Sequence, residues 1–378
     1  MKDSTVVIRT YKYRLYPSKS QETNLFRVRD ACHGLYNMVL AERKYVWQEY
    51  GETVPSETLQ AFGKRYRKTF PYAQQVYSQT VQSVIERVDE AYQGFFRRVK
   101  KGEKPGYPRF KSKQQFNSFE FKQYGSGCKI DGRRLKIYGV GRVKVRWHRE
   151  LIGKIKLVRI KHQAGEWYAS FVCEVPRKQT ITSDWEIGID VGVSALITTS
   201  DGEKVENPKY YRAGQAKLRR LSRKLARAQR GSRHRKQALQ AVQRQHRHVA
   251  NQREDFLHKL THTITNIYGR VAIEDLQINN MVKNRHLSKS ILDSGWGLFK
   301  EQLQYKAAEA GVQLALVNPY KTSRKCSNCQ REFVNLTLQD RWVECLCGLS
   351  LDRDHNAAIN ILKQAGWDTS AVANVECV

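Results

Sequence analysis

An aspartate stands in the middle of a strongly apolar stretch, IGIDVG, at position 190. The flanking residues predict a buried strand, and an ionised carboxylate is costly to bury unless a cation holds it. One interpretation of Asp190 is a structural salt bridge to a basic side chain. The other is a carboxylate that binds a metal ion, and the remaining acids of the chain bear on the choice.

Two further acids occupy comparable places. Glu274 ends the apolar run VAIE, and Asp354 opens a helical pattern near the end of the chain. Strand and helix patterns alternate after about residue 185, which predicts an α/β unit with acids at its strand ends. Two Mg²⁺ ions about 4 Å apart can activate water and stabilise the leaving oxygen of a phosphodiester, and they need oxygen ligands on rigid elements. The three acids together therefore predict a nuclease.

The charge of the chain indicates its partner. Lys plus Arg number 67 against 36 Asp plus Glu, which gives a net charge of +31. Aromatic residues interleaved with the cations suit bases as well as phosphates. No apolar run reaches the roughly 18 residues of a membrane span, and the N-terminal residues have no apolar signal core. We expect a cytoplasmic, nucleoid-associated protein that binds nucleic acid and no membrane.

Four cysteines are crowded into one short segment near the end of the chain: Cys326, Cys329, Cys345 and Cys347. The first two form a CxxC knuckle, and four thiolates at this separation predict one tetrahedral Zn²⁺ site. The other cysteines are isolated, which in a reducing compartment predicts ordinary packing: Cys32, Cys128, Cys173 and Cys377.

Residues before about 185 predict a different architecture. An alternating strand runs to Pro17, helical periodicity fills about 20–100, and the basic tract 100–113 is broken by Gly and Pro as a linker would be. Short alternating segments follow, which predict a barrel or sandwich that includes the first strand. In the later α/β unit, the basic residues 214–267 predict two helices separated at Gly231. We call them the basic pair, which forms either a solvated hairpin or a phosphate-binding surface. The polar segment 279–297 is either a mobile lid or an ordinary surface loop.

The chain resembles TnpB proteins of bacterial and archaeal insertion sequences, the compact relatives of type V CRISPR nucleases. The motifs that carry the resemblance are IGIDVG, VAIEDL, CGLSLDRDHNAAINIL, YKYRLYPS near the start, and AYQGFFRRVKKGEKPGYPRFKSK. The resemblance implies an RNase H-like RuvC nuclease domain with a zinc-finger insertion. It also implies a preceding oligonucleotide-binding-type β-barrel that carries an inserted helical recognition domain.

The domain boundaries that this organisation predicts cover the whole chain. They are a first barrel (wedge) strand at 1–18, a helical recognition domain at 19–103, the wedge β-barrel at 104–183, the RuvC domain at 184–321 with basic helices at 214–267, the zinc finger at 322–350, the final RuvC helix at 351–365 and a C-terminal tail at 366–378.

The resemblance implies an RNA-guided endonuclease. Its guide RNA would derive from the transposon end, and a monomeric protein in a ribonucleoprotein would cut double-stranded DNA beside a short adjacent motif. Motif by motif, Asp190, Glu274 and Asp354 match the catalytic acids that bind Mg²⁺ or Mn²⁺, with Asp352 and Asn356 in support. Two alternatives stay open, a guided DNA-binding repressor that does not cut and a transposase accessory protein.

The thiol segment departs from the family pattern. Family members have a second CxxC directly before a glycine, whereas Cys345 and Cys347 are separated by one residue before Gly348. A one-residue deletion accounts for the difference. Two thiols at this spacing can still reach one ion, so a weakened zinc site and Glu344 as a minor substitute ligand stay open.

Nucleic-acid contacts follow from the guided mechanism. An A-form heteroduplex is held through its backbone, and exposed cations on a long helix or in the linker suit that role. The cationic candidates are Arg219, Arg220, Arg223, Lys224, Arg227, Arg230, Arg109, Lys111 and Lys113. The protein itself must read the adjacent motif, and SQTVQSVIERV resembles the family segment that does so. Gln79 and Gln82 can bond adenine edges, Tyr77 and Gln123 are further candidates, and exposed structural glutamine is the alternative.

Overall fold

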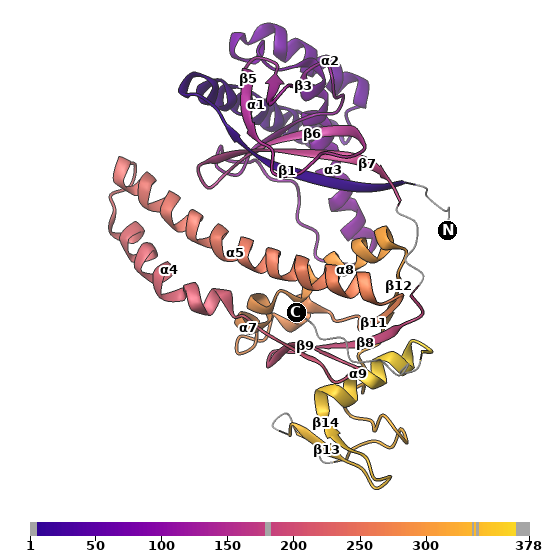
Figure 1. Cartoon of the computed structure of the whole chain (residues 1–378). Helices are drawn as coiled ribbons and strands as arrows, with labels where there is room; N and C mark the ends of the chain where they lie inside the picture. The colour runs from indigo at the N-terminus through magenta and orange to yellow at the C-terminus, as the bar shows by residue number, and fades with distance from the viewer. Residues whose placement is uncertain (1–5, 178–182, 335, 338–339, 368–378) are drawn as a thin grey trace. The chain divides into compact units, whose positions relative to one another are not determined.

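The computed structural model describes residues 6–177, 183–334, 336–337 and 340–367, which divide into two compact units, 1–176 and 177–378 (Figure 1). The first five residues of the predicted first strand lie outside the described residues, as does most of the predicted C-terminal tail. None of the helices formed by the described residues has the length and apolar composition needed to cross a bilayer.

The first unit is built on an antiparallel sheet with the order β2-β6-β7-β1-β5-β4-β3. Its strands are β1 (Val6–Tyr16), β2 (Ser118–Phe121), β3 (Cys128–Asp131), β4 (Arg134–Ile137), β5 (Gly141–Arg146), β6 (Lys154–Gln163) and β7 (Glu166–Pro176). The first strand pairs with both β5 and β7, as its alternation predicts. The end strands β2 and β3, both described, do not pair with each other, so hydrogen bonding does not close the sheet into the predicted barrel.

Three helices complete this unit: α1 (Lys19–Tyr50), α2 (Ser56–Thr69) and α3 (Ser78–Lys100). Helix α1 begins with a capping box, in which the Ser18 hydroxyl accepts from the Gln21 amide and the Gln21 side chain accepts from the Ser18 amide. It ends at Gly51 in the left-handed conformation. The buried helix faces share one core with Tyr11, Tyr13 and the other inward side chains of the sheet.

The second unit contains a mixed sheet with the order β10-β9-β8-β11-β12. Its strands are β8 (Glu186–Val191), β9 (Ala195–Thr199), β10 (Lys204–Glu206), β11 (Arg270–Glu274) and β12 (Gln313–Val317). Strand β9 runs antiparallel to β8 and β10, whereas β8, β11 and β12 are parallel. Parallel neighbours require crossover connections, and the alternating strand and helix patterns of the sequence predicted such a unit.

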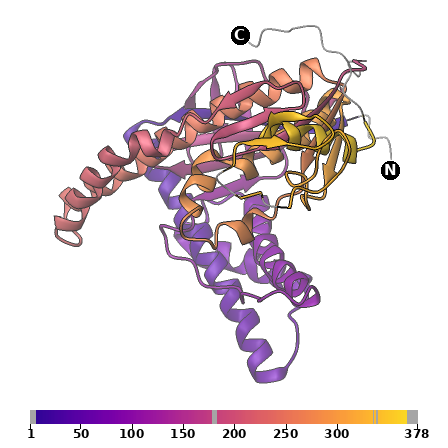
Figure 2. The same cartoon turned by 90° about the horizontal axis from the view of Figure 1, so that it is seen from below.

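Helices cover both faces of this sheet, as Figures 1 and 2 show. The described helices of this unit are α4 (Tyr210–Arg227), α5 (Arg233–Ile267), α6 (Ile278–Met281), α7 (Ser288–Ser294), α8 (Trp296–Ala310) and α9 (Arg353–Gln364). A short hairpin of β13 (Trp342–Glu344) and β14 (Ser350–Asp352) precedes α9. The predicted break in the basic pair is confirmed, because Gly231 lies between α4 and α5 with a φ of 82°.

The polar segment after Glu274 is more structured than its composition suggests. It forms α6 and α7, and its Asp293 is buried. The Asp293 carboxylate accepts from the amides of Tyr211 and Arg212 at the start of α4 and lies 3.4 Å from an Arg253 nitrogen. These contacts favour a packed segment over the mobile lid.

The faces of β8 differ in what they contact. Successive strand side chains point to opposite faces. Ile187 and Ile189 are buried in the core that α5 and α8 share with the sheet. Gly188 and Asp190 therefore lie on the opposite face, toward α9. At Gly188 the approach is so close that an added Cβ would come within 2.2 Å of the Ala358 carbonyl oxygen.

The neighbouring strand β11 repeats the arrangement. Ala272 is buried with Ile361 of α9, so its strand alternation places Glu274 on the same face. The β8–β11 register pairs Ile189 with Ile273, which puts the ends carrying Asp190 and Glu274 side by side. The face that α9 covers therefore receives both strand acids.

We predict that Gly188→Ala lowers the free energy of unfolding by about 1–3 kcal/mol, because the new methyl group meets a backbone oxygen that cannot move away without shifting α9. Thermal unfolding measures the change. The matched control is Gly297→Ala, where the nearest atom to an added Cβ is 3.5 Å away, and its unfolding temperature should not fall. Equal stability of the two variants would show that α9 does not depend on this approach.

Candidate functional site

The three predicted acids are brought together at one end of the second unit's sheet. Asp190 lies at the end of β8, Glu274 at the end of β11 and Asp354 in the first turn of α9. Burial first, and then the negative charges of Glu274 and Asp354, raise the pKa of Asp190 well above its ordinary value. A partly buried group of like charges is a setting that favours a bound cation.

Glu274 has a partner that sequence analysis did not identify. The Thr322 hydroxyl donates to a Glu274 carboxylate oxygen, and Thr322 is almost fully buried. Burial raises the pKa of Glu274, and this hydrogen bond acts in the opposite direction. Nothing in the local sequence marks this threonine, because it belongs to an irregular segment with no periodicity.

Asp352 orients the third acid. It is the N-cap of α9, and its side chain accepts hydrogen bonds from the amides of Asp354 and His355. Its other oxygen lies 2.7 Å from Lys204 Nζ. Burial opposes ionisation, but the Lys204 and amide hydrogen bonds hold the pKa of Asp352 below its ordinary value. The structure thus makes Asp352 the N-cap of the helix that carries Asp354, and its predicted supporting role stays a prediction.

Two arginines lie beside Asp354. An Arg341 nitrogen and Arg353 Nε each lie 4.0 Å from one of its carboxylate oxygens. Arg353 also opposes the rise in the pKa of Asp190. Its Nε atom is buried and has no hydrogen-bond partner among the described residues. These cations partly offset the charge of the three acids.

The predicted zinc ligands converge. Among the described His, Cys, Asp and Glu residues, one group of three or more has ligand atoms that all lie within 4.8 Å of one another: Cys326, Cys329, Cys345 and Cys347. We call these four cysteines the thiol cluster. Two sulfur pairs, 326/347 and 329/345, lie 3.6 and 3.5 Å apart. Four sulfurs about 2.3 Å from a tetrahedral Zn²⁺ are about 3.8 Å apart, so the cluster fits that ion.

The single residue between the last two cysteines does not prevent convergence. A tight turn closes this loop, in which the Gly348 amide donates to the Cys345 carbonyl and Gly348 has a φ of 89°. Glu344 is exposed on β13 and is not one of the four converging residues. The minor alternative, a Glu344 ligand, is therefore not supported.

Two asparagines tie the segment that carries the thiols to α9. Asn356 Oδ1 accepts from the Ser327 amide, and its Nδ2 donates to the Lys325 carbonyl. Asn360 lies one turn later and donates to the carbonyls of Thr322 and Lys325. Asn356 is thus placed between the two sites, while Asn360 was missed. The spacing of four residues, which puts both on one helix face, was the available signal.

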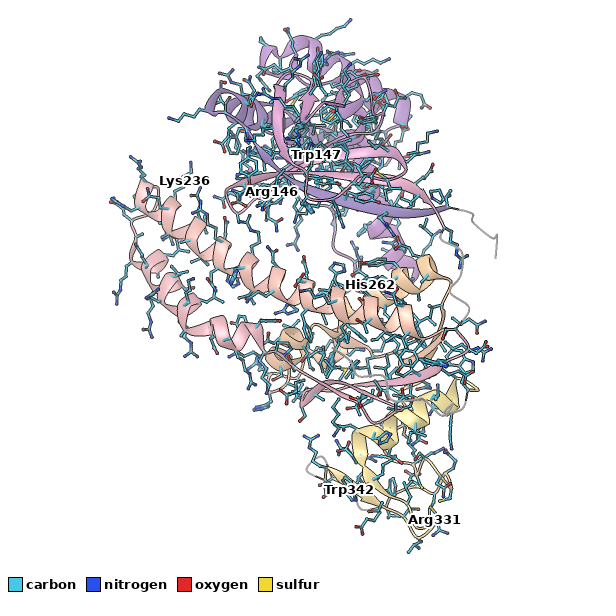
Figure 3. All side chains as sticks on the ribbon, viewed as in Figure 1. Arg146, Trp147, Lys236, His262, Arg331 and Trp342 are labelled. Atoms are coloured by element: carbon cyan, nitrogen blue, oxygen red, sulfur yellow. The ribbon has the colours of Figure 1, made fainter. Side chains whose placement is uncertain are left out.

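The candidate cations of the basic pair are free to meet a ligand. Arg219, Arg220, Arg223, Lys224, Arg227 and Arg230 are all exposed. The contacts of the described residues include no ion pair or hydrogen bond from any of these six side chains. Figure 3 shows Lys236 pointing outward near the start of α5, at the same end of the pair. Such a row of unpaired cations is self-repelling until an anion binds.

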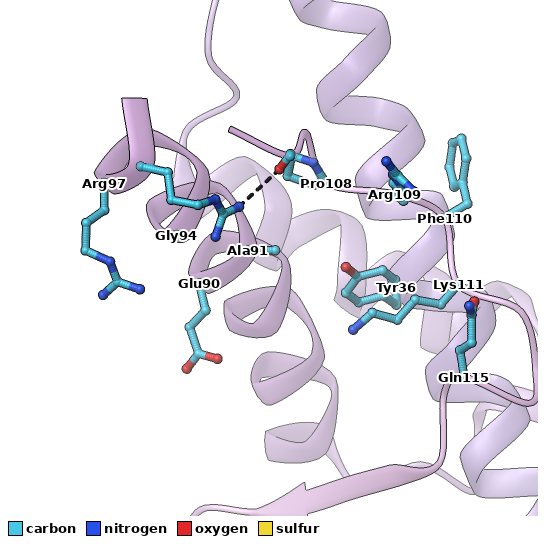
Figure 4. Close-up of a pocket in the computed structure, with 12 residues that line it drawn as sticks. Tyr36, Glu90, Ala91, Gly94, Arg97, Pro108, Arg109, Phe110, Lys111 and Gln115 are labelled. Carbon is cyan, nitrogen blue, oxygen red and sulfur yellow. Dashed lines mark hydrogen bonds between the residues drawn. The ribbon is translucent and has the colours of Figure 1, made fainter. Parts of the chain in front are cut away.

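Two of the three linker candidates, Arg109 and Lys111, line a pocket of about 640 Å³ in the first unit (Figure 4). Arg109 is exposed there, together with Arg97. Lys111 is more constrained, because its ammonium lies 4.4 Å from the centre of the Tyr36 ring, and burial lowers its pKa. Lys113 is exposed apart from a 3.7 Å ion pair with Asp30. The pocket is thus lined by four cations, Arg97, Arg98, Arg109 and Lys111, of which Arg97 and Arg109 are exposed.

The candidates for base reading divide into two groups. The Gln79 amide donates to Gln123 Oε1, and Gln82 is exposed one turn further along α3. These three amides share one surface. Tyr77 instead packs its ring against Tyr138 and Phe121, with centroids 5.4 and 6.3 Å apart.

Three family models match the chain. Their descriptions are "Probable transposase" for residues 170–285, "Cas12f1-like, TNB domain" for 296–361 and "Helix-turn-helix domain" for 1–52. The last description differs from the structure, in which the described residues of that range form strand β1 and the single helix α1.

Relatives cover nearly the whole chain. A protein of Streptomyces pristinaespiralis named "Putative RNA-guided DNA endonuclease" is 31% identical over 97% of this chain and 91% of its own length. An Escherichia coli K12 protein named "Putative RNA-guided DNA endonuclease InsQ" is 29% identical over 94% of this chain and 92% of its own. The solved Cas12f1-sgRNA-target DNA complex has a similar protein fold, with a TM-score of 0.60 at 14% identity, covering 95% of this chain and 99% of that one.

We expect the purified protein to contain about one equivalent of zinc, and Cys326→Ser to lose it, because a thiolate is removed from a four-thiolate site. Elemental analysis of both proteins measures the metal. Cys128→Ala, which changes an isolated buried cysteine, should keep its zinc. Wild-type protein without zinc would contradict the assignment.

We expect Asp190→Asn to stabilise the metal-free fold at pH 7.5 by on the order of 1 kcal/mol. The folded-state pKa of Asp190 is raised, so its contribution to stability is full at acid pH and is lost as the pH rises. Asparagine does not ionise, so the difference in the free energy of unfolding between Asp190→Asn and wild type should shrink as the pH falls toward 5. Urea unfolding in Mg²⁺-free buffer without chelator, which keeps the zinc, measures the difference.

The control for this experiment is Asp255→Asn, an exposed acid paired with Lys259 on α5, whose effect on stability should not follow this pH pattern. An Asp190→Asn protein less stable than wild type at pH 7.5 would show that the ionised carboxylate is already compensated within the fold.

Proposed function

The chain belongs to the TnpB family, and on this premise we propose that it is an RNA-guided DNA endonuclease. It would bind a guide RNA derived from the transposon end and cleave double-stranded DNA beside a short adjacent motif. The observation that carries the proposal is the convergence of Asp190, Glu274 and Asp354 at one end of a sheet, in a chain with a net charge of +31. The names of the two relatives support the same activity.

The sheet of the second unit supports the RuvC assignment. Its strand order places the first strand, β8, at the centre, with an antiparallel meander on one side and parallel strands on the other. An RNase H-like domain has this mixed arrangement. The segments that interrupt it here are the basic helices α4 and α5 and the thiol cluster, so we assign 184–321 and 351–365 to that domain and 322–350 to a zinc finger.

The three acids fit a pair of hard divalent cations. They supply carboxylate oxygens from rigid strand and helix ends, and their mutual repulsion is relieved by bound positive charge. We propose that Asp190, Glu274 and Asp354 hold Mg²⁺ or Mn²⁺, which supplies activation of water and stabilisation of the leaving oxygen in phosphodiester hydrolysis.

The protein's own groups arrange and balance these acids. Asp352 fixes the first turn of α9 and so the direction of Asp354, while Lys204 neutralises Asp352. Thr322 restricts Glu274. Arg353 and Arg341 lie close enough to Asp354 to hold the scissile phosphate near the acids once cations have taken over the carboxylates.

Nucleic acid would be held by both units. The exposed row from Arg219 to Arg230 suits the backbone of an RNA–DNA heteroduplex, which the protein need not read by sequence. Arg109 and Lys113 add exposed cations in the first unit. The amides of Gln79, Gln82 and Gln123 form the surface we assign to the adjacent motif, since paired amide groups can bond base edges.

The direct test is cleavage by the purified ribonucleoprotein. RNA that copurifies with protein expressed beside its own transposon end should map to that end, and the complex should linearise a plasmid with a guide-matched target only with Mg²⁺ or Mn²⁺. Asp190→Ala should lower the cleavage rate by at least about 10³-fold, the size of loss typical for a group central to the chemistry. A time course on an agarose gel measures the rate.

Glu301→Gln is the matched control, because it removes an exposed carboxylate of α8 in the same unit. Its cleavage rate should equal that of wild type. Undiminished cleavage by Asp190→Ala would overturn the assignment of the acids, and random cellular RNA in the preparation would overturn the guided mechanism.

A further inference from the structure

A buried threonine outside the family's three acids contacts one of them directly. Thr322 is 4% exposed and follows β12 after a short turn in which Lys321 has a φ of 61°. Its hydroxyl donates to Glu274 Oε1, and the one further acceptor near it among the described residues, the Pro319 carbonyl, is 3.4 Å away. The carboxylate is therefore its principal partner.

This bonding differs from that of Thr265, an equally buried threonine of α5. The Thr265 hydroxyl, 2% exposed in α5, donates to the Thr261 carbonyl of the preceding helical turn. Such a bond is local and serves the helix itself. The bond from Thr322 instead crosses from an irregular segment to the end of a sheet strand. It leaves the second Glu274 oxygen unpaired by Thr322 and available to a cation.

The position of Thr322 is in turn fixed by Asn360. That side chain is 3% exposed, and its Nδ2 donates to the Thr322 carbonyl at 2.8 Å and to the Lys325 carbonyl at 2.7 Å. Its Oδ1 accepts from Gln330 Nε2 at 3.2 Å. Both amide hydrogens and the oxygen are therefore engaged by the segment 322–330. Asn360 has no free group for substrate, and its structural task is to hold that segment on α9.

Three parts of the molecule meet through this pair. Thr322 contacts the second acid, Asn360 shares α9 with the third acid, and the segment between them contains Cys326 of the thiol cluster. Hydrogen bonds to a metal-ligating carboxylate orient it and tune its affinity for the ion. A shift of the segment 322–330 would therefore move the Thr322 hydroxyl and, through its hydrogen bond, the Glu274 carboxylate.

We propose that Thr322 is a positioning residue of the nuclease site, which fixes the carboxylate of Glu274 for divalent cations, and that Asn360 acts through Thr322. The inference rests on the proposed function, because it assigns the residue a role toward the cations of that reaction. Because Thr322 acts through Glu274, its loss should change cation affinity more than the binding of guide RNA or target DNA.

The test compares Thr322→Val, which keeps the shape and removes the hydroxyl, with Thr322→Ser, which keeps the hydroxyl. Titration calorimetry with Mn²⁺ on the purified ribonucleoprotein gives cation affinity, and cleavage rates at graded Mg²⁺ give the half-saturating concentration. We expect Thr322→Val to lower the Mn²⁺ affinity and to raise the half-saturating Mg²⁺ concentration, each by about 10- to 100-fold. Thr322→Ser should stay within about threefold of wild type, and target-DNA binding should be equal in all three proteins.

Thr265→Val is the matched control, since it makes the same change at an equally buried threonine whose hydroxyl has only carbonyl partners. It should bind Mn²⁺ as wild type does. Wild-type cation affinity in Thr322→Val, beside normal wild-type cleavage, would overturn the inference and leave the proposed function standing. A wild-type complex that neither binds Mn²⁺ nor cleaves would overturn both.

Asn360→Ala tests the second part of the proposal. If Asn360 acts through Thr322, the Asn360→Ala/Thr322→Val protein should be no weaker in Mn²⁺ binding than the weaker single variant. If the two losses of Mn²⁺ affinity multiply in the double variant, Asn360 acts on the cation site independently of Thr322. Should Asn360→Ala fail to unfold cooperatively, Asn360→Asp, which keeps an acceptor for Gln330 but loses the donor to Thr322, takes its place in the same cycle.

Discussion

The close approach of α9 to β8 is the contact on which the second unit depends. At Gly188 there is no space for a side chain, and Ala357 and Ala358 present small side chains to the sheet. Because the helix lies this near, residues on it can reach the ends of two strands. Asp354, in the first turn of α9, depends on that range. A larger residue at the contact would separate the acids as well as weaken the core.

Like charges lie close together in two places, among the three acids and along the cations of α4. The charges of Glu274 and Asp354 add to burial in raising the pKa of Asp190, and the exposed cations of α4 repel one another along the helix. The arginines beside Asp354 offset the first cost only in part, and no ion pair of the described residues offsets the second at the candidate cations of α4. Under the proposed function, divalent cations would relieve the first cost and a polyanion the second.

The sequence allowed much of this to be predicted, for identifiable reasons. Asp190 stands out because an acid interrupts an apolar strand, and the cysteines because their spacing is that of metal ligands. Strand alternation also placed β1 in a sheet with strands far along the chain. Thr322 has no such mark, since an irregular segment has no period and the hydrogen bond depends on where β11 ends. For the same reason the stacking of Lys111 on Tyr36 and the packing of Tyr77 against Tyr138 required tertiary structure.

The loop between Cys345 and Cys347 and the helix α9 differ in how they accept changes in length. Between Cys345 and Cys347 the chain is a turn, and turns can absorb a missing residue because no downstream side chain depends on its phase. Helix α9 is the opposite case. The contacts of Asp354, Asn356 and Asn360 depend on their present positions around the helix axis. One residue inserted directly after Asp354 would rotate both asparagines by about 100° relative to Asp354. Natural length variation in relatives should therefore collect in the thiol loops and be absent from the first two turns of this helix.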